Sequence, residues 1–355
     1  MASRSRRQWA TGQEAGTMSS TLRRFATVAA SACIGVAVLA PLSGAAPASS
    51  PTRAATWLAS QLRDGAIRSG SSVNVADTAA AALALSTVPA TQHTGALALA
   101  TIYRSAKSLL AGVSTTHPGE VAELILAAHT YGVSATKFGG VNLVGLLTAS
   151  LQGPKSADPG RFGSEDPTYD GTYRQGLALA ALRAVGQPIP APAVTWLSAQ
   201  RCPSGAFSSD RLANPCSGLA VNYAGPDSNS TALALVGYAA AVKSPPTATW
   251  AQVKASQAAS GGFAFYPGQP ADPDSTALVV LGLDSVRSPL SADLGATKAA
   301  ASLSYLRSTQ QASGGVTYPG NPQPDVASTT EALWAWSGQP LWHRFDPSAA
   351  RLVTG

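Results

Sequence analysis

The chain has 355 residues, of which 45% are hydrophobic and only 12% are charged, so it can bury a substantial core and is not typical of a disordered protein. Its net charge of +6 arises largely in residues 1–48, which carry five arginines and one glutamate. Subtracting these from 24 basic and 18 acidic residues leaves 19 and 17, or about +2, for the remainder. Because the remaining Lys and Arg are scattered, we expect no nucleic-acid-binding surface.

The N-terminus has the pattern of an export signal. Arg23 and Arg24 precede an apolar run over residues 25–40, and residues 46–48 form a small-x-small cleavage site. Met18 would give a shorter and more ordinary start. We therefore predict that residues 1–48 are a cleaved signal and that the mature protein is secreted.

Two cysteines, Cys202 and Cys216, remain after the predicted cleavage. An exported protein meets an oxidising environment, so we predict a disulfide between them, with two free thiols as the alternative. A third cysteine, Cys33, lies within the signal and leaves lipidation as a second interpretation of this segment.

The strongest signal is an internal repeat. Three consecutive units begin at Trp196, Trp250 and Tyr305, pass through a glycine-rich turn, and continue to an Asp that is followed by Ser-Thr. Earlier units are more degenerate. Anchors for the second half of each unit fall near residues 78, 121, 172, 231, 276 and 329, which predicts six units of about 45 to 55 residues.

Each unit reads as a helical hairpin. The first helix keeps a polar face, whereas the second is apolar on all sides, as in residues 276–283, and must be buried on all sides. Because the first and last units are no more polar than the others, we expect the stack to close on itself. The prediction is an all-α toroid of six inner and six outer helices over residues 49–345, followed by a short tail at 346–355.

These segments resemble the prenyltransferase and squalene-cyclase repeat family, whose fold is the α/α toroid. Protein prenyltransferases of this family bind zinc through Asp, Cys and His. Here the mature cysteines are expected to be paired, and the four histidines occupy no repeated position. We therefore predict no metal and no cofactor.

The resemblance to class II terpene cyclases centres on Asp272-Pro273-Asp274-Ser275-Thr276-Ala277, which is similar to their Asp-x-Asp-Asp-Thr-Ala motif. Asp274 matches the acid that protonates a polyprenyl chain, and Asp272 matches the first acid. Ser275 departs from the pattern. Because acids recur in other units, we expect Asp274 to be a helix cap. Such cyclases also usually carry a second helical domain, for which this chain has no room.

A third branch contains exported, non-catalytic toroids such as extracellular cobalamin carriers. On this interpretation one end of the inner ring binds an apolar or amphipathic, corrinoid- or terpenoid-like molecule. The candidate binding residues are aromatic and acidic side chains before the inner helices, namely Tyr223, Tyr266, Tyr318, Asp170, Asp227 and Asp325. Packing and capping are the alternative roles for these residues. We predict a non-enzymatic binding protein, with a cyclase using Asp274 and a protein-interaction scaffold with a cell-surface partner as alternatives.

Overall fold

The computed structural model describes residues 51–111, 117–164, 171–208, 216, 225–286 and 294–355. The chain divides into two units, Met1–Ala48 and Ser49–Gly355, and the description below concerns the second. Across these described ranges, no helix is both long enough and apolar enough to cross a membrane.

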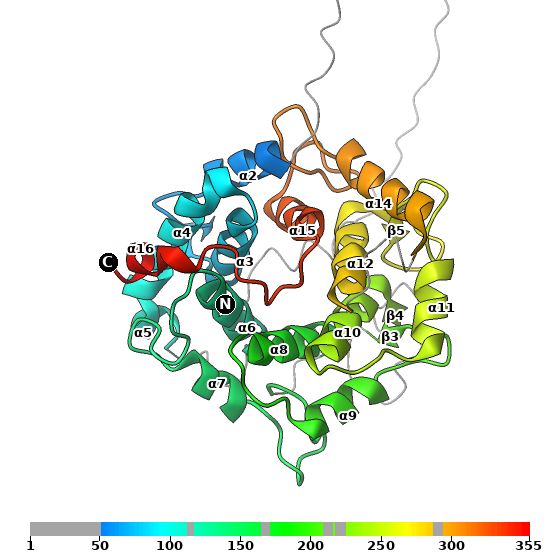
Figure 1. Cartoon of the computed structure of the whole chain (residues 1–355), viewed down its shortest axis with the longest axis horizontal. Helices are drawn as coiled ribbons and strands as arrows, with labels where there is room; N and C mark the ends of the chain where they lie inside the picture. The colour runs from blue at the N-terminus through cyan, green and yellow to red at the C-terminus, as the bar shows by residue number, and fades with distance from the viewer. Residues whose placement is uncertain (1–50, 112–116, 165–170, 209–215, 217–224, 287–293) are drawn as a thin grey trace, which may run out of the picture. The chain divides into compact units, whose positions relative to one another are not determined.

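Six helices form an inner ring (Figure 1). Each packs against the next in chain order, and the last packs against the first, so the ring is closed. In order these helices are α3 (Val75–Ser86), α6 (Pro118–Thr130), α8 (Thr172–Ala184), α10 (Ser228–Ala240), α12 (Pro273–Ser285) and α15 (Val326–Ser337). The six anchors expected from the repeat all lie in these helices, which confirms the predicted toroid.

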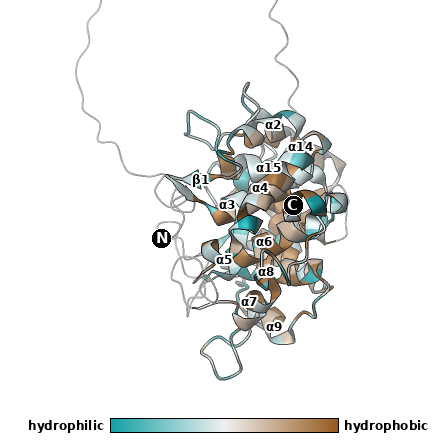
Figure 2. Ribbon diagram, turned by 90° about the vertical axis from the view of Figure 1, so that its left-hand side faces the viewer, coloured by the Kyte–Doolittle hydropathy of each residue, from teal (hydrophilic) through white to brown (hydrophobic). Residues whose placement is uncertain are grey.

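An outer helix precedes each inner helix in the chain. The outer helices are α2 (Pro51–Ser60), α4 (Gln92–Arg104), α7 (Leu143–Ala149), α9 (Ala191–Ala199), α11 (Thr247–Ala255) and α14 (Ala296–Ser308). Figure 2 shows the hairpins from the side, with hydrophilic residues in the peripheral loops. The short elements are η1 (Pro89–Thr91), α5 (Ala106–Leu109), η2 (Pro347–Ala349) and α16 (Ala350–Thr354). The end of the expected tail is therefore helical, and α16 packs against α4.

The inner helices begin with a repeated cap. Asp227, Asp272 and Asp325 are the N-caps of α10, α12 and α15. In each case the carboxylate accepts a hydrogen bond from the backbone N–H three residues later, at 2.7, 2.7 and 2.8 Å respectively. The cap satisfies one of the N–H groups that the first turn of a helix leaves unpaired.

A threonine four residues after the cap fastens the preceding turn to the helix. The hydroxyl of Thr276 accepts from the N–H of Phe263 at 2.8 Å, and Thr231 and Thr329 act in the same way on Phe207 and Val316. The two phenylalanine side chains are fully buried.

Short antiparallel ladders accompany this arrangement, and the sequence did not predict them. They pair β1 (Arg68–Ser69) with β2 (Ser72–Val73), β3 (Phe207–Ser208) with β4 (Pro226–Asp227), and β5 (Phe263–Ala264) with β6 (Ala271–Asp272).

A glycine at the end of each turn joins neighbouring hairpins. Gly205 and Gly261 have positive φ, and a Cβ there would lie 2.3 and 2.5 Å from a backbone oxygen of the following outer helix. A Cβ on Gly314, in the last hairpin, would likewise lie 2.5 Å from the carbonyl oxygen of Arg53, in the first outer helix α2. The guanidinium of Arg53 also donates to the carbonyl oxygen of Ala312 at 2.6 Å. The contact that joins consecutive units is therefore also the contact that closes the ring.

The predicted disulfide is present. Cys202 and Cys216 are bonded, with their Cα atoms 5.3 Å apart and a separation of 14 positions in sequence. Cys202 lies three residues after the end of α9, so the bond ties the chain after this outer helix to Cys216, which precedes α10 in the sequence.

Candidate functional site

Three of the acids proposed from sequence are N-caps. Asp227 and Asp325 were expected to bind a ligand, and Asp272 to flank a catalytic acid. Each accepts a hydrogen bond from its own helix, and the second carboxylate oxygens of Asp272 and Asp325 also accept from the hydroxyls of Ser275 and Ser328. These acids thus have an architectural role.

Asp274 is different, and its expected role as a cap is wrong. The N-cap of α12 is Asp272, and Asp274 lies two residues further on, inside the first turn. The equivalent positions of α10 and α15 are Asn229 and Ala327. The acid that recurs in the repeat is therefore Asp272, whereas Asp274 is specific to its unit.

Asp274 is buried without full hydrogen bonding. It is 3% exposed, and its Oδ1 has no hydrogen-bond partner among the described residues. Burial raises its pKa well above the ordinary value, and the nearby carboxylates of Asp325 and Asp272 raise it further, against a smaller lowering by the Ser328 hydroxyl. This environment favours a neutral carboxylic acid that can donate a proton.

The pKa values of the two neighbouring N-cap residues, Asp272 and Asp325, are also raised. Burial raises the pKa of Asp272 to about 6, against the hydrogen bonds that it accepts from Ser275. Burial also raises the pKa of Asp325. The N-terminal ends of α12 and α15 thus bring together three carboxyl groups that favour their protonated forms more than exposed acids do.

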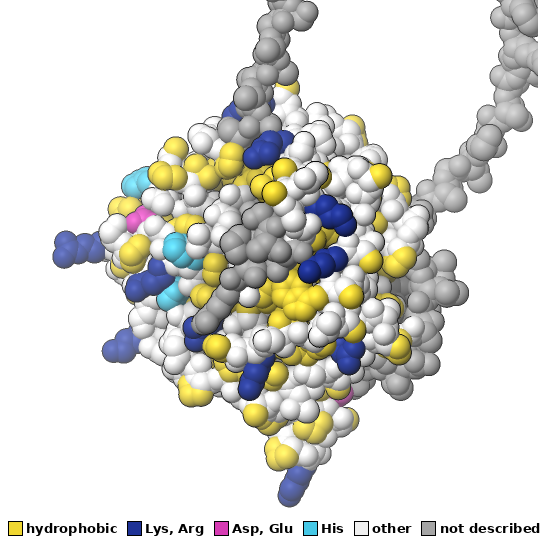
Figure 3. All heavy atoms as spheres, turned by 45° about the vertical axis from the view of Figure 1, so that its right-hand side comes forward, with side chains coloured by type: hydrophobic (Ala, Val, Ile, Leu, Met, Phe, Trp, Pro, Cys, Tyr) yellow, Lys and Arg dark blue, Asp and Glu magenta, His cyan; other side chains and the backbone are white. Residues whose placement is uncertain are grey.

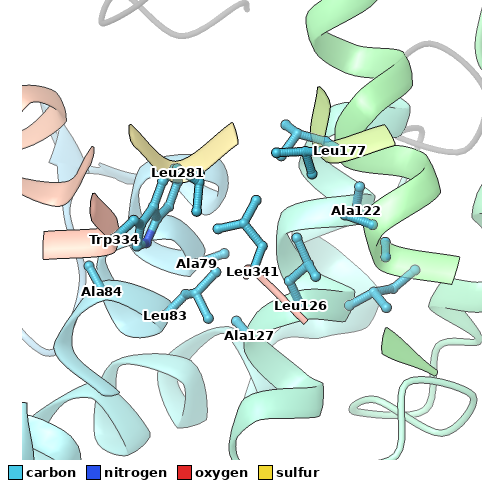
Figure 4. Close-up of a cluster of buried hydrophobic side chains, with 14 of the residues drawn as sticks. Ala79, Leu83, Ala84, Ala122, Leu126, Ala127, Leu177, Leu281, Trp334 and Leu341 are labelled. Atoms are coloured by element: carbon cyan, nitrogen blue, oxygen red, sulfur yellow. The ribbon is translucent and has the colours of Figure 1, made fainter. Parts of the chain in front are cut away.

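The centre of the ring is apolar at the level of the third turns of the inner helices. Figure 4 shows side chains from the inner helices and one from the chain after α15 pointing toward a common centre. They are at most 4% exposed, and they are Leu83, Leu126, Leu281, Trp334 and Leu341. At this level the interior is filled by side chains.

Helical spacing places Asp274 on the same inner face. It lies seven residues before Leu281, which is close to two turns, and seven residues rise about 10 Å along the axis. Glu331 and Glu123 precede Trp334 and Leu126 by three residues and share their faces in the same way. Polar groups therefore lie above the apolar centre, toward the N-terminal ends of the inner helices.

Sequence reasoning missed Glu123 and Glu331. Both are buried, and both occupy a position where α10 and α12 carry Leu233 and Leu278. A charge in place of a repeated leucine was the signal that could have revealed them. The sequence does not decide which of Trp334 and Trp336 faces the interior of the ring. The structure places Trp334 at its centre.

The two described tyrosines, Tyr266 and Tyr318, lie at turns before inner helices. Tyr266 is buried, with its ring centroid 4.3 Å from that of Phe265, and Tyr318 is half-buried. Each begins a tight turn in which its carbonyl oxygen accepts from the N–H three residues later. Tyr223 and Asp170 lie outside the described residues.

No group of three or more His, Cys, Asp or Glu side chains is arranged to hold a metal ion in the described part of the chain. Figure 3 shows one face of the molecule, on which Lys and Arg side chains are dispersed rather than gathered in a stripe.

No family model matches the chain, and no curated protein matches its sequence. Solved structures do match. A protein from Actinoplanes is 16% identical with a TM-score of 0.57, covering 81% of this chain and 98% of that one. The type II terpene cyclase MstE from Scytonema is 14% identical with a TM-score of 0.56, covering 81% and 95%. A wild-type glycosidase is 12% identical with a TM-score of 0.51, covering 82% and 98%.

The fold is the α/α toroid. It is shared with terpene cyclases and glycosidases, as the resemblance of the repeats implied.

Proposed function

We propose that this protein is an exported enzyme in which Asp274 is the general acid toward an apolar, alkene-containing substrate held inside the ring. The observation that carries the proposal is the environment of Asp274, a buried carboxyl group that is not the cap of α12 and whose Oδ1 has no hydrogen-bond partner in the part of the chain that the structure describes. The disulfide and the pattern of residues 1–48 support export.

The proposed step needs only the protein and its substrate. The O–H of neutral Asp274 adds its proton to one carbon of a C=C bond, and the positive charge develops on the other carbon. A C–C bond closes when a second alkene attacks that carbon, and loss of a proton from an adjacent carbon restores an alkene. The product is an isomer of the substrate, and solvent returns a proton to Asp274.

The position of Asp274 suits this chemistry. A carboxylic acid that protonates an alkene must be kept neutral until it reacts and must be shielded from water, which would otherwise take the proton. Burial and two neighbouring carboxyl groups support the first condition. The apolar side chains below Asp274 support the second. Since Asp274 is only 3% exposed, substrate entry requires movement of the chain around it.

The binding-protein hypothesis has weaker support. Of its six candidate residues, Asp227 and Asp325 are caps and Tyr266 packs on Phe265. A carrier would hold the same class of apolar molecule without changing it, so the two hypotheses differ in whether a bond is formed.

The deciding experiment is incubation of the purified full chain in D₂O with geranylgeraniol and with geranylgeranyl dihydroxybenzoate, the substrate bound to MstE in another solved structure. Acid catalysis predicts a cyclised product that carries one deuterium from solvent, detected by mass spectrometry and NMR. Recovery of unchanged substrate that co-elutes with the protein would favour the carrier. Absence of both turnover and binding would favour the scaffold.

A further inference from the structure

Leu341 lies at the centre of the ring although it belongs to no helix. It is part of the segment that leaves α15 at Gly338 and reaches η2, and we call residues 338–346 the C-terminal strap. Figure 1 shows the strap, in red, running across one end of the inner ring. Its Leu341 side chain is 3% exposed and lies among Leu126, Leu281 and Trp334 (Figure 4).

The C-terminal end of the strap, residues 344–346, is hydrogen-bonded to the C-terminal end of α6. The N–H of Asp346 donates to the carbonyl oxygen of Thr130 at 3.1 Å, and the N–H of Phe345 donates to the Thr130 hydroxyl at 3.1 Å. The guanidinium of Arg344 donates to the carbonyl oxygen of His129 at 3.3 Å. Because α16 follows and packs on α4, Leu341 is held from both directions.

Leu341 and its neighbours therefore form the floor of the ring interior. The floor lies at the level of Leu281, about 10 Å along the helix axis from Asp274. Between the two levels Figure 4 labels the small side chains of Ala79 and Ala122 and the larger one of Leu177, and Glu123 and Glu331 also lie at this height. A chain that enters from the end near Asp274 and reaches the apolar level meets the floor there, with Leu341 at its centre.

We infer that Leu341 sets the length of the apolar chain that the ring accepts. The inference rests on the proposed function, because it takes Asp274 as the reacting end of the site. A smaller side chain at 341 deepens the interior and favours longer chains, and a larger one makes it shallower and favours shorter chains. Pocket discrimination by one or a few methylene groups is worth roughly 10- to 200-fold in rate.

The test compares geraniol, farnesol and geranylgeraniol as substrates for the wild type, Leu341→Ala and Leu341→Trp. We expect the ratio of kcat/KM for the longest to the shortest alcohol to rise about tenfold or more in Leu341→Ala and to fall in Leu341→Trp. Leu341→Val serves if Leu341→Ala does not fold. Leu352→Ala is the matched control, since Leu352 lies on α16 and is 40% exposed. Unchanged ratios in an active protein would overturn the inference.

A second measurement separates this inference from the proposed function. Dry apolar cavities made by truncating a core side chain bind benzene. Benzene should therefore raise the Tm of Leu341→Ala, or of Leu341→Val, and leave that of the wild type and of Leu352→Ala unchanged. If no alcohol is turned over but benzene acts in this way, Leu341 does close the interior, and only the proposed chemistry fails. If benzene has no selective effect, Leu341 does not close the interior and the inference fails whatever the activity.

Discussion

Two aspartates separated by a single proline have different roles in this protein. Asp272 and Asp274 are both 3% exposed, but the carboxylate of Asp272 accepts two hydrogen bonds from Ser275, whereas Oδ1 of Asp274 accepts none from the described residues. The Ser328 hydroxyl lowers the pKa of Asp274 less than burial raises it, so this carboxyl group favours its neutral form. The structural acid and the candidate catalytic acid thus differ in the hydrogen-bond donors that each can reach.

Asp274→Asn should abolish turnover and leave the fold intact. The amide keeps the volume of the side chain and cannot supply a proton. Because it also removes a buried ionisable group, we expect the free energy of unfolding to stay the same or to rise. Activity assays and urea denaturation check both parts. Asp227→Asn is the matched control, since Asp227 caps α10, is not one of the carboxyl groups that raise the pKa of Asp274, and Asn is an equally good N-cap. Equal activity of Asp274→Asn and wild type would contradict the role of Asp274 as the acid.

The stability of the protein should fall as pH rises through the range where Asp272 ionises. Its pKa is about 6 when folded and 3.8 when unfolded. Below the unfolded value both states hold the proton, and between the two values only the folded state holds it. The stabilisation present at low pH is then lost, by about 3 kcal/mol once the pH exceeds the folded pKa. Asp274 extends the loss to higher pH, because its pKa is raised in the same direction.

His129 acts in the opposite direction and must be separated from this effect. Burial lowers its pKa, so its contribution to stability is present above the unfolded value and is lost as the pH falls. The informative quantity is the difference in unfolding free energy between wild type and Asp272→Asn, measured from pH 4 to pH 8. Parallel curves for the two proteins would show that Asp272 does not ionise as described.

At the scale of an element, the unit of construction is the cap together with the threonine four residues later. In α12 the threonine hydroxyl donates to the carbonyl oxygen of Asp272 at 2.7 Å and accepts from the N–H of Phe263. One side chain thus connects the start of a helix to the turn before it. The same connection in α3 runs from Thr78 to Ile67, and in α8 a glutamine takes the place of the threonine and holds Phe162.

Thr276→Val should destabilise the protein by about 1 to 3 kcal/mol, because it preserves the shape of the side chain but leaves the buried N–H of Phe263 without an acceptor. Thr354→Val is the control, since Thr354 is exposed on α16 and its hydroxyl donates only to the carbonyl oxygen of Ala350. Chemical denaturation of both variants measures the difference. Similar losses in the two proteins would mean that the hydroxyl does not fasten the turn.

The repeat made most of this architecture predictable. Caps, glycine turns and apolar inner helices recur at regular spacing, so hairpins and ring closure could be derived from local rules. The strap and Leu341 could not, because this segment occurs once and has no pattern to compare. Asp274 was misassigned because its acidic neighbour Asp272 is the repeated residue, and a shift of two positions separates the cap from the inner face. Glu123 and Glu331 needed the helices to be aligned with one another.

At the scale of the whole ring, Gly314 joins the last hairpin to the first. Gly314→Ala should destabilise the protein more than Gly320→Ala. Both glycines have positive φ, which costs a residue with a Cβ about 1 to 2 kcal/mol, but only at Gly314 would the new Cβ meet a backbone atom, the Arg53 carbonyl oxygen.

Thermal denaturation and hydrogen exchange test this prediction. We expect a lower Tm for Gly314→Ala and faster exchange of the amides in α2 and α15, the helices on either side of the closure. Gly320→Ala should show neither a comparable fall in Tm nor local exchange in α2. An equal effect of the two substitutions would indicate that backbone strain alone, and not the contact with Arg53, determines the loss.

The contact between Gly314 and Arg53 also limits how such a protein can change in size. An open stack of hairpins grows by duplication of a unit, since each end accepts another copy. Here the sixth unit already rests on the first, and an added seventh would have to separate Gly314 from Arg53 and change the angle between every pair of neighbours. New properties are therefore introduced most readily by single substitutions on the inward faces of a ring whose number of units stays constant.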